Sequence, residues 1–374
     1  MKYKINKNQI SVLLPETSIL NFTTVVVNCL SEQKNINIYV ISNFEFPELR
    51  HSNKISNFSY YPKTKSESEW LTNIEKELKK FSIDFIIPID VYSIKTLIKN
   101  RNNVSFSNKI GLLPDFNSFN IANDKSSLAK HMLKNNIPFP KTFHYSKEEL
   151  LENIVDRYPI LIKPITESEA GEGIVKFNDF NQLKSFLLNN ELSFSYIIQK
   201  YIVGYDIDCS VLCEKGKIVV FTIQKGILSG KTEFGPNNGV EFLYAEKLYR
   251  VVEKLMKTLN WSGVAHVDLR YDMDEDSYKV IEINPRFWSS LDASLAAGIN
   301  FPYIYLLKSL NIDFVKPMYN HIKFLNLLGL MKTIRNNKLF IFNLRFIMKY
   351  TTMRFYLKDA LPFVYLIYNK FRNS

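Results

Sequence analysis

Two apolar segments near residue 270 carry carboxylates in the middle of what would otherwise be buried strands. They are GVAHVDLRYD (263–272) and YKVIEINPR (278–286), joined by the acidic, polar turn DMDEDS. This pattern predicts a β-hairpin that can place Asp268 and Glu282 on one face. Because side chains alternate along a strand, Asn284 and Arg286 follow Glu282 on that face. Buried charges need a partner or a metal ion, so this face is a candidate metal site.

The donor atoms of the hairpin favour a hard divalent cation. Asp268, Glu282 and Asn284 offer only oxygen ligands, with no cysteine nearby, which suits Mg²⁺ or Mn²⁺. Arg286 can meet a phosphate oxygen through its guanidinium fork. The alternative is a solvated strand face with an ordinary charge pattern. Apolar neighbours indicate that the strand is buried and so favour the metal site; they are Val280, Ile281, Ile283, Phe287 and Trp288.

Two lysines occupy positions where a bound anion would stabilise them. Lys163 ends the buried run PILIK, and Lys125 lies in the first turn of the helix predicted from NDKSSLAKHML. An ammonium group is unfavourable both in a buried strand and at a helix N-terminus unless an anion is near. Each could instead be an ordinary surface lysine. Between Lys163 and the hairpin, TESEAGEGIV holds two of the chain's 12 glycines and can aim backbone N–H groups at phosphates, although it matches neither the Walker nor the dinucleotide pattern.

The order of the apolar runs predicts an α/β domain followed by α+β units. ISVLL, INIYVIS and IDFIIPID alternate with helix-like segments, which is typical of an open parallel sheet and places such a domain at 1–118. Residues 119–203 combine helices with short strands. From 204 to 312, long alternating stretches with a hairpin turn at Lys215 and Gly216 predict an antiparallel sheet. Residues 313–374 are predicted to be a basic, amphipathic helical tail.

The positive charge is concentrated in this tail. Residues 331–374 hold nine Lys or Arg and one acid, which is +8 of the net charge of +11. The overall basicity therefore does not indicate a nucleic-acid-binding protein. Two interpretations of the tail stay open: a helical appendage packed on its own domain, or a basic amphipathic surface held at an anionic membrane or a membrane-bound partner. The sequence does not indicate an oligomeric state.

Cysteine usage and hydropathy predict a cytoplasmic protein. The three cysteines show no C-x-x-C spacing, which suits a reducing compartment. The N-terminus lacks the apolar centre of a signal peptide, and no run of about 18 apolar residues predicts a spanning helix. If the tail binds lipid, we expect the protein at the inner face of the membrane.

Taken in order, several segments resemble the ATP-grasp superfamily, and in particular its carbamoyl-phosphate-synthase-like carboxylate–amine ligases. They are NDKSSLAKHMLKNNIPFPKT, PILIKP, IIQKYIVGYDIDCSV, and GVAHVDLRYD with YKVIEINPRFW. The resemblance covers roughly residues 10–310. It implies an ATP-grasp fold of α/β and α+β parts, in which ATP lies between two α+β subdomains, here 119–203 and 204–312.

The resemblance also implies roles for individual residues. Asp268, Glu282 and Asn284 match the metal ligands, and Arg286 matches an arginine that contacts phosphate or substrate. His266 stands where some of these ligases carry an arginine that steadies the tetrahedral intermediate, and Arg270 is a candidate to replace it. Lys163 is a candidate for both catalysis and nucleotide binding. The positions that match nucleotide-binding residues are Lys125, Lys163, Ser168, Glu169, Ala170, Gly171, Gln199, Lys200, Tyr201, Ile202 and Asp206.

Besides His266, two features depart from the family's pattern. Gln199 stands where glutamate is common, and the phosphate loop has fewer glycines than usual. The resemblance still implies ATP binding, because backbone groups of the segment around Lys200 and Ile202 read much of the adenine edge.

The reaction that the resemblance implies is attack of a carboxylate on the γ-phosphate of ATP, followed by capture of the acylphosphate by an amine. The products are an amide, ADP and phosphate, and the expected cofactors are ATP with Mg²⁺ or Mn²⁺. The expected partners are small-molecule carboxylate and amine substrates. Two alternatives stay open: a kinase that phosphorylates a hydroxyl group, and a nucleotide-binding scaffold without turnover. The intact set of Asp268, Glu282, Asn284 and Lys163 argues against the scaffold.

Overall fold

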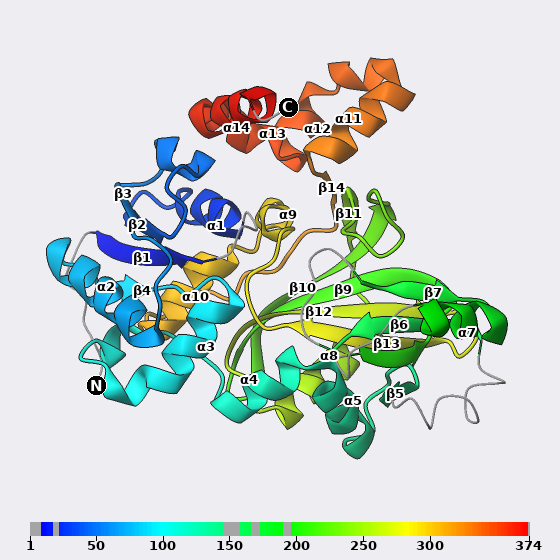
Figure 1. The fold of residues 1–374 in the computed structure, drawn as a ribbon. Coiled ribbons are helices and arrows are strands. Elements are labelled where there is room, and N and C mark those ends of the chain that lie inside the picture. The colour runs from blue at the N-terminus through cyan, green and yellow to red at the C-terminus, as the bar shows by residue number, and fades with distance from the viewer. Residues whose placement is uncertain (1–8, 18–21, 145–157, 166–172, 190–195, 373–374) are drawn as a thin grey trace.

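An open parallel sheet forms the N-terminal part of the molecule (Figure 1). The computed structural model describes residues 9–17, 22–144, 158–165, 173–189 and 196–372. The strand order is β3-β2-β1-β4, with all neighbours parallel. The central strand is buried along nearly its whole length, as strands covered by helices on both faces must be. The elements are β1 (Ile10–Glu16), α1 (Phe22–Leu30), β2 (Ile36–Ser42), η1 (Glu48–His51), β3 (Asn57–Tyr60), α2 (Glu67–Lys80), β4 (Phe85–Ile86), α3 (Val91–Asn100), η2 (Arg101–Asn103) and η3 (Ser107–Lys109).

The covering helices follow from local sequence signals. Ser66 caps α2 by accepting a hydrogen bond from the backbone N–H of Glu69, and Trp70, Ile74 and Leu78 follow at four-residue spacing and are buried. Such spacing gives the helix one apolar stripe to pack on the sheet. The predicted parallel α/β arrangement of this region is confirmed.

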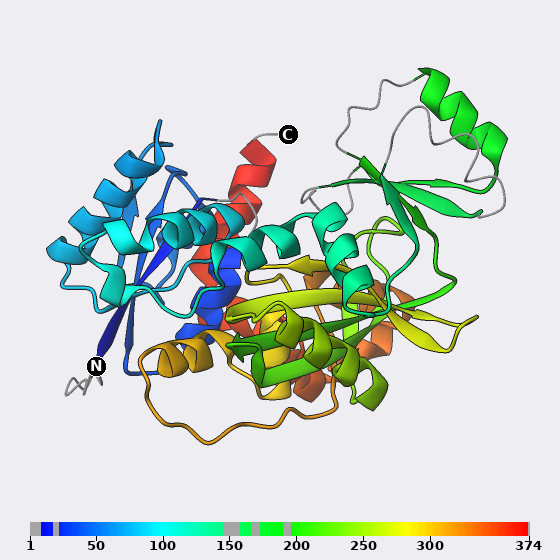
Figure 2. The ribbon, with the colours of Figure 1, turned by 90° about the horizontal axis from the view of Figure 1, so that it is seen from below.

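A small antiparallel sheet follows and projects from one side of the molecule, as Figure 2 shows. Its strand order is β5-β8-β6-β7. The elements of this part are α4 (Phe116–Asn123), α5 (Lys125–Lys134), β5 (Thr142–His144), β6 (Ile160–Pro164), β7 (Val175–Phe177), α7 (Phe180–Asn189) and β8 (Tyr196–Lys200).

A six-stranded antiparallel sheet in the order β13-β12-β9-β10-β11-β14 is the centre of the molecule. The predicted turn joins β9 to β10 at Lys215 and Gly216, which have φ angles of 48° and 76° and so fit a hairpin turn with two left-handed residues. One segment of the predicted helical tail differs from expectation, because Lys323–Leu325 pairs with β11 and extends this sheet. The elements are β9 (Gly204–Glu214), β10 (Lys217–Leu228), β11 (Gly239–Phe242), α8 (Glu246–Thr258), β12 (Gly263–Asp272), β13 (Ser277–Asn284), α9 (Leu291–Ala297), α10 (Phe301–Ser309) and β14 (Lys323–Leu325).

The N-terminal sheet and the large sheet share one hydrophobic core. Side chains of β1, β2 and α1 pack with Phe287 and Trp288, which follow β13, and with α9 and α10. The backbone N–H of Phe287 donates to the carbonyl of Ile89, just after β4, at 3.3 Å. The end of β13 is therefore fixed by the N-terminal domain and by its own sheet.

The C-terminal helices lie together at one end of the molecule and pack on the N-terminal domain (Figure 1). Glu32 accepts from Arg354 at 3.1 Å and from Lys358 at 2.8 Å, and the rings of His51 and Tyr365 lie 4.2 Å apart. These contacts agree with the interpretation of a packed appendage. No helix within the described ranges is long and apolar enough to cross a membrane. The elements are α11 (Leu327–Asn336), η5 (Lys338–Phe342), α12 (Leu344–Tyr350), α13 (Met353–Lys358) and α14 (Ala360–Arg372).

A buried carboxyl group lies where α1, α9 and the C-terminal helices meet. Asp292 is 3% exposed and accepts from the Asn28 amide at 3.2 and 3.3 Å. Asn28 in turn accepts from the Lys54 ammonium at 2.7 Å. Burial raises the pKa of Asp292 to about 7, against the opposing effect of the Asn28 hydrogen bonds and the Lys54 and Arg354 charges. The protonated form of this side chain is thus favoured by folding.

We expect this carboxyl group to make stability depend on pH. Asp292 titrates near 7 in the folded chain and near 4 when unfolded, so its contribution is fully present below about pH 4 and is lost as pH rises toward 7. Asp292→Asn removes this titration. Its free energy of unfolding should improve relative to wild type by about 1 kcal/mol per pH unit between pH 5 and 7, measured by urea unfolding.

The matched control is Asp276→Asn, at an exposed carboxyl group whose pKa is lowered by the Tyr271 hydrogen bond and Lys247. This variant should keep a constant difference from wild type over the same range. Parallel pH curves for Asp292→Asn and wild type would contradict the assignment.

Candidate active site

Three adjacent strands align their polar residues in one row. Asp268 on β12 lies opposite Glu282 on β13, and His266 lies opposite Asn284. On its other side, Asp268 lies opposite Asp208 of β9. The predicted hairpin therefore brings its two carboxylates together, and a third strand adds another.

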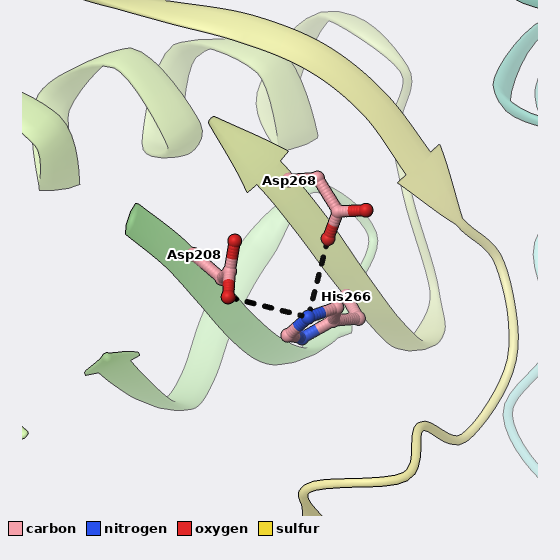
Figure 3. Close-up of side chains that lie close together, drawn as sticks. All are labelled: Asp208, His266 and Asp268. Carbon is pink, nitrogen blue, oxygen red and sulfur yellow. Dashed lines mark ion pairs between the residues drawn. The ribbon is translucent and has the colours of Figure 1, made fainter. Parts of the chain in front are cut away.

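Asp208, His266 and Asp268 form a compact group, shown in Figure 3. The imidazole Nε2 lies 3.2 Å from an Asp268 oxygen and 3.9 Å from an Asp208 oxygen, and Nδ1 lies 2.8 Å from the Ser210 hydroxyl. One potential ligand atom from each of the three residues lies within 4.8 Å of the others. The sequence interpretation missed Asp208. Its signal was the two-residue spacing from Asp206, which puts both on one face of β9.

The histidine of this group does not balance the negative charges of Asp208 and Asp268. Burial raises the pKa of Asp268 well above its ordinary value, and the charges of Asp208 and Glu282 add to the rise. Burial also raises the pKa of Asp208 to about 7. His266 does not compensate, because burial and the Arg286 charge lower its pKa to about 3 and leave it neutral. Crowded carboxylates of this kind fit a hard divalent cation, which would favour their ionised forms.

Glu282 has a partner from the helix that enters the site. The Lys125 ammonium, in the first turn of α5, lies 2.9 Å from a Glu282 oxygen. Burial alone would raise the pKa of Glu282, but Lys125 and Lys163 outweigh it and the pKa falls to about 2. The Lys125 backbone N–H donates to the carbonyl of Ile165, just beyond β6, at 3.0 Å. The first turn of α5 is thereby joined to both subdomains.

Asn284 and Arg286 extend the row at the end of β13. The Asn284 amide donates to Asp268 at 3.0 Å, and its oxygen accepts from Arg286 at 3.1 Å. The Arg286 guanidinium also lies over the ring of Phe22 at 4.2 Å and donates to the Phe287 carbonyl. Of the three predicted metal ligands, Asp268 and Glu282 thus present carboxylates, whereas the Asn284 oxygen is held by Arg286.

Lys163 is almost fully enclosed within the small sheet. It is 5% exposed, and its ammonium donates to the Gln199 oxygen at 2.9 Å. Gln199 is oriented by a second bond, from its amide nitrogen to the Thr142 hydroxyl at 3.0 Å. Burial lowers the pKa of Lys163 to about 8, because the neutral amide offsets little of the desolvation. The glutamine that departs from the family's pattern therefore gives this lysine a neutral partner.

Arg270 contacts the segment that links the subdomains. Its guanidinium donates to the carbonyls of Ile202 at 2.7 Å and Gly204 at 3.0 Å, to the Tyr201 hydroxyl, and to Asp206. These bonds direct it toward the start of β9 and away from the Asn284 end of the row. Lys200 is fixed at the same segment, where its backbone N–H donates to the carbonyl of Lys141 at 2.9 Å.

The predicted phosphate loop and Trp288 differ in how far the structure describes them. Ser168, Glu169, Ala170 and Gly171 lie outside the described residues. Trp288, one of the apolar neighbours of the predicted metal strand, is 2% exposed and packs edge-on against Phe301 at 4.9 Å between ring centres. It also stacks on His266 at 5.4 Å, so it supports the site from within the core.

Part of the chain matches a known domain family, and its fold is similar to those of several solved structures. Residues 122–290 match the ATP-grasp domain family. D-aspartate ligase of Enterococcus faecium is 23% identical over 231 residues, which are 55% of this chain and 54% of that protein, so the match spans about half the length of the relative. L-amino acid ligase from Bacillus licheniformis has a TM-score of 0.63 at 17% identity, covering 82% of this chain and 75% of that one.

An N5-carboxyaminoimidazole synthetase from Staphylococcus aureus, solved with ADP, has a TM-score of 0.69 at 15% identity and covers 90% of this chain and 88% of that one. These similarities define the class: the protein has the ATP-grasp fold. More particularly, residues 122–290 are the part of the chain that the ATP-grasp domain family matches, which bears out the predicted resemblance to that superfamily.

The lowered pKa of Lys163 leads to a prediction about ATP. If Lys163 contacts a phosphate of ATP, as the resemblance implies, only its ammonium form does so, and ATP affinity should fall as pH rises above about 8, by up to roughly tenfold per pH unit. In Gln199→Glu, the new carboxylate raises the pKa of Lys163 and should move this loss to higher pH. Titration calorimetry between pH 7 and 9.5 measures both curves, and coinciding pH profiles would remove Lys163 from the phosphate site.

Proposed function

We propose that the protein is an ATP-dependent ligase that joins a carboxylate to an amine through an acylphosphate. The observation that carries the proposal is the meeting of two lysines with a row of carboxylates. Lys125 lies 2.9 Å from Glu282, and the charges of both act on the pKa of Lys163. A triphosphate and its cation require this combination, because carboxylates hold the metal while ammonium groups neutralise the phosphates. Similarity to a D-aspartate ligase supports an acid and an amine as substrates.

In this proposal, Asp268 and Glu282 hold Mg²⁺ or Mn²⁺. Asn284 would be a third ligand, and Arg286, which donates to its amide oxygen, would contact the transferred phosphate. When bound, the cation neutralises charge on the phosphates during transfer. Arg286 is well placed for this contact, because its position at the end of β13 is supported by the Phe22 ring and the Phe287 carbonyl.

His266 stands where some of these ligases carry an arginine, so in this proposal Arg286 is the side chain that stabilises negative charge on the tetrahedral intermediate. A neutral imidazole can accept a hydrogen bond, but it supplies no positive charge to an oxyanion. Arg270 is committed to Ile202, Gly204 and Asp206. We therefore assign Arg270 to positioning the nucleotide segment rather than to stabilising the tetrahedral intermediate. His266 remains a candidate acceptor for the incoming amine.

Nucleotide binding in this proposal uses the segment that Arg270 supports. Backbone groups of Lys200, Tyr201 and Ile202 contact the adenine, and Asp206 contacts the ribose. Lys125 and Lys163 contact the phosphates. The resemblance assigns Ser168, Glu169, Ala170 and Gly171 to phosphate binding.

The reaction is proposed to take place in a reducing compartment, the cytoplasm. Cys29, Cys209 and Cys213 are buried thiols without disulfides. Burial raises the pKa of all three, which keeps them in the unreactive protonated form.

The experiment that tests the function measures ADP release with pairs of candidate substrates. We expect turnover only when a carboxylate and an amine are supplied together, since the acylphosphate needs the amine to complete the cycle. Mass spectrometry should show an amide product and one ADP per amide. Stoichiometric phosphorylation of a hydroxyl compound alone would establish the kinase alternative. ATP binding without turnover for any pair in the screen would favour the scaffold.

Removing the charge of one proposed metal ligand should abolish this turnover. Glu282→Gln keeps the size of the side chain but loses a carboxylate that the cation and Lys125 need, so kcat should fall by at least about a hundredfold. Glu241→Gln, on β11 beside Lys323, is the matched control and should retain activity. A Glu282→Gln enzyme with wild-type kcat would exclude the metal assignment.

A further inference from the structure

The outward surface of the C-terminal helices is both apolar and basic. Of the 23 large apolar side chains that are exposed among the described residues, twelve lie between Leu328 and Tyr368. Seven of these belong to residues 327–350, which form α11, η5 and α12. We call the exposed side chains of 327–350 the basic apolar face. Exposed apolar side chains gathered in this way mark an interaction surface in soluble proteins.

The helical spacing puts apolar and basic side chains on the side that faces solvent. In α11, Leu328, Met331, Lys332 and Arg335 are exposed at intervals of three and four residues, whereas Leu330 is buried. An ordinary surface helix shows the reverse, with its apolar stripe inward and polar residues outward. The same holds in η5, where Leu339 and Phe342 are 74% and 78% exposed. The exposed apolar side chains of α11 and η5 therefore do not contribute to the packed core of the fold.

The charges of the face have one sign. Lys332, Arg335, Lys338, Arg345 and Lys349 are exposed, and none forms an ion pair with a carboxylate among the described residues. Arg354 and Lys358, farther along the chain, are used differently, because they hold the appendage to Glu32. Asp359, which is the acid of this part of the sequence, is 5% exposed and accepts from Ser52. Negative charge is thus kept away from the face.

We propose that the basic apolar face docks on an anionic membrane surface, an interaction that goes beyond the ligase activity. A lipid surface matches both properties: anionic headgroups meet the lysines and arginines, and the interfacial region takes side chains such as Leu339 and Phe342. A second copy of this chain is the poorer partner, because a symmetric contact would oppose the same five cations. Nucleic acid would match the charge and leave the apolar side chains exposed.

The appendage holds this face rigidly relative to the enzyme. Contacts of Glu32 with Arg354 and Lys358, and the packing of His51 on Tyr365, fix the C-terminal helices on the N-terminal domain. Docking would therefore orient the N-terminal domain, on which these helices pack, relative to the membrane.

The test is sedimentation of the full chain with vesicles. Wild type should pellet with vesicles that contain phosphatidylglycerol and remain in solution with phosphatidylcholine alone, and binding should weaken as salt is raised. Lys332→Glu/Arg335→Glu/Lys338→Glu should lower partitioning by more than about tenfold, because each cation near an anionic surface contributes roughly fivefold. Leu339→Ser/Phe342→Ser should also lose binding.

The matched control reverses three exposed lysines of the N-terminal domain, Lys34→Glu/Lys65→Glu/Lys76→Glu, and should pellet as wild type does. Urea unfolding and ADP release confirm that each variant is folded and active, since none of these residues belongs to the proposed active site. Failure of wild type to bind anionic vesicles overturns the proposal, as does equal binding by the charge-reversed variant. Self-association in sedimentation velocity that Leu339→Ser/Phe342→Ser abolishes, without lipid binding, would instead assign the face to a second copy.

Discussion

The concentration of negative charge where β9, β12 and β13 meet is the constraint on which the rest of the structure depends. Strand register alone brings Asp208, Asp268 and Glu282 side by side. Carboxylates that are crowded and buried are unfavourable as anions, which is why the pKa values of Asp208 and Asp268 are raised. Cations from other elements lie beside this group: Lys125 of α5 contacts Glu282, and Arg286, beyond β13, donates to Asn284.

These counter-charges join parts of the chain that have separate sheets. Lys125 contacts Glu282 through its side chain and Ile165 through its backbone. Arg270 ties β12 to the segment that leads out of the small sheet. The N-terminal domain completes the arrangement, because its core continues into Phe287 and Trp288. The site is therefore a junction of three units, and its geometry depends on all three being packed.

The side chains of the site that follow from strand alternation could be predicted from the sequence. Alternation along β12 and β13 placed Asp268, Glu282 and Asn284 on one face, and the register shows them there. Asp208 was missed, although the same alternation from Asp206 pointed to it. The partners of Arg270 could not be deduced, since Ile202 lies 68 residues away and the bond depends on how β12 pairs with β9. Long-range partners require a register, and local periodicity does not supply one.

By itself, the sequence determined the parallel α/β domain, the antiparallel hairpins and the charge-bearing strands, because each follows from local hydrophobic period and turn residues. It also determined the positive net charge of the tail, in which basic residues are interspersed with apolar ones. Only the tertiary structure decided which charges meet. It enclosed Lys163 against a neutral amide, turned Arg270 toward the start of β9, and fixed the tail through Glu32 with its apolar stripe outward. The physical reason is that burial and charge pairing depend on contacts between distant segments. Helix and strand periodicity, in contrast, depends on residues that are close together in the sequence.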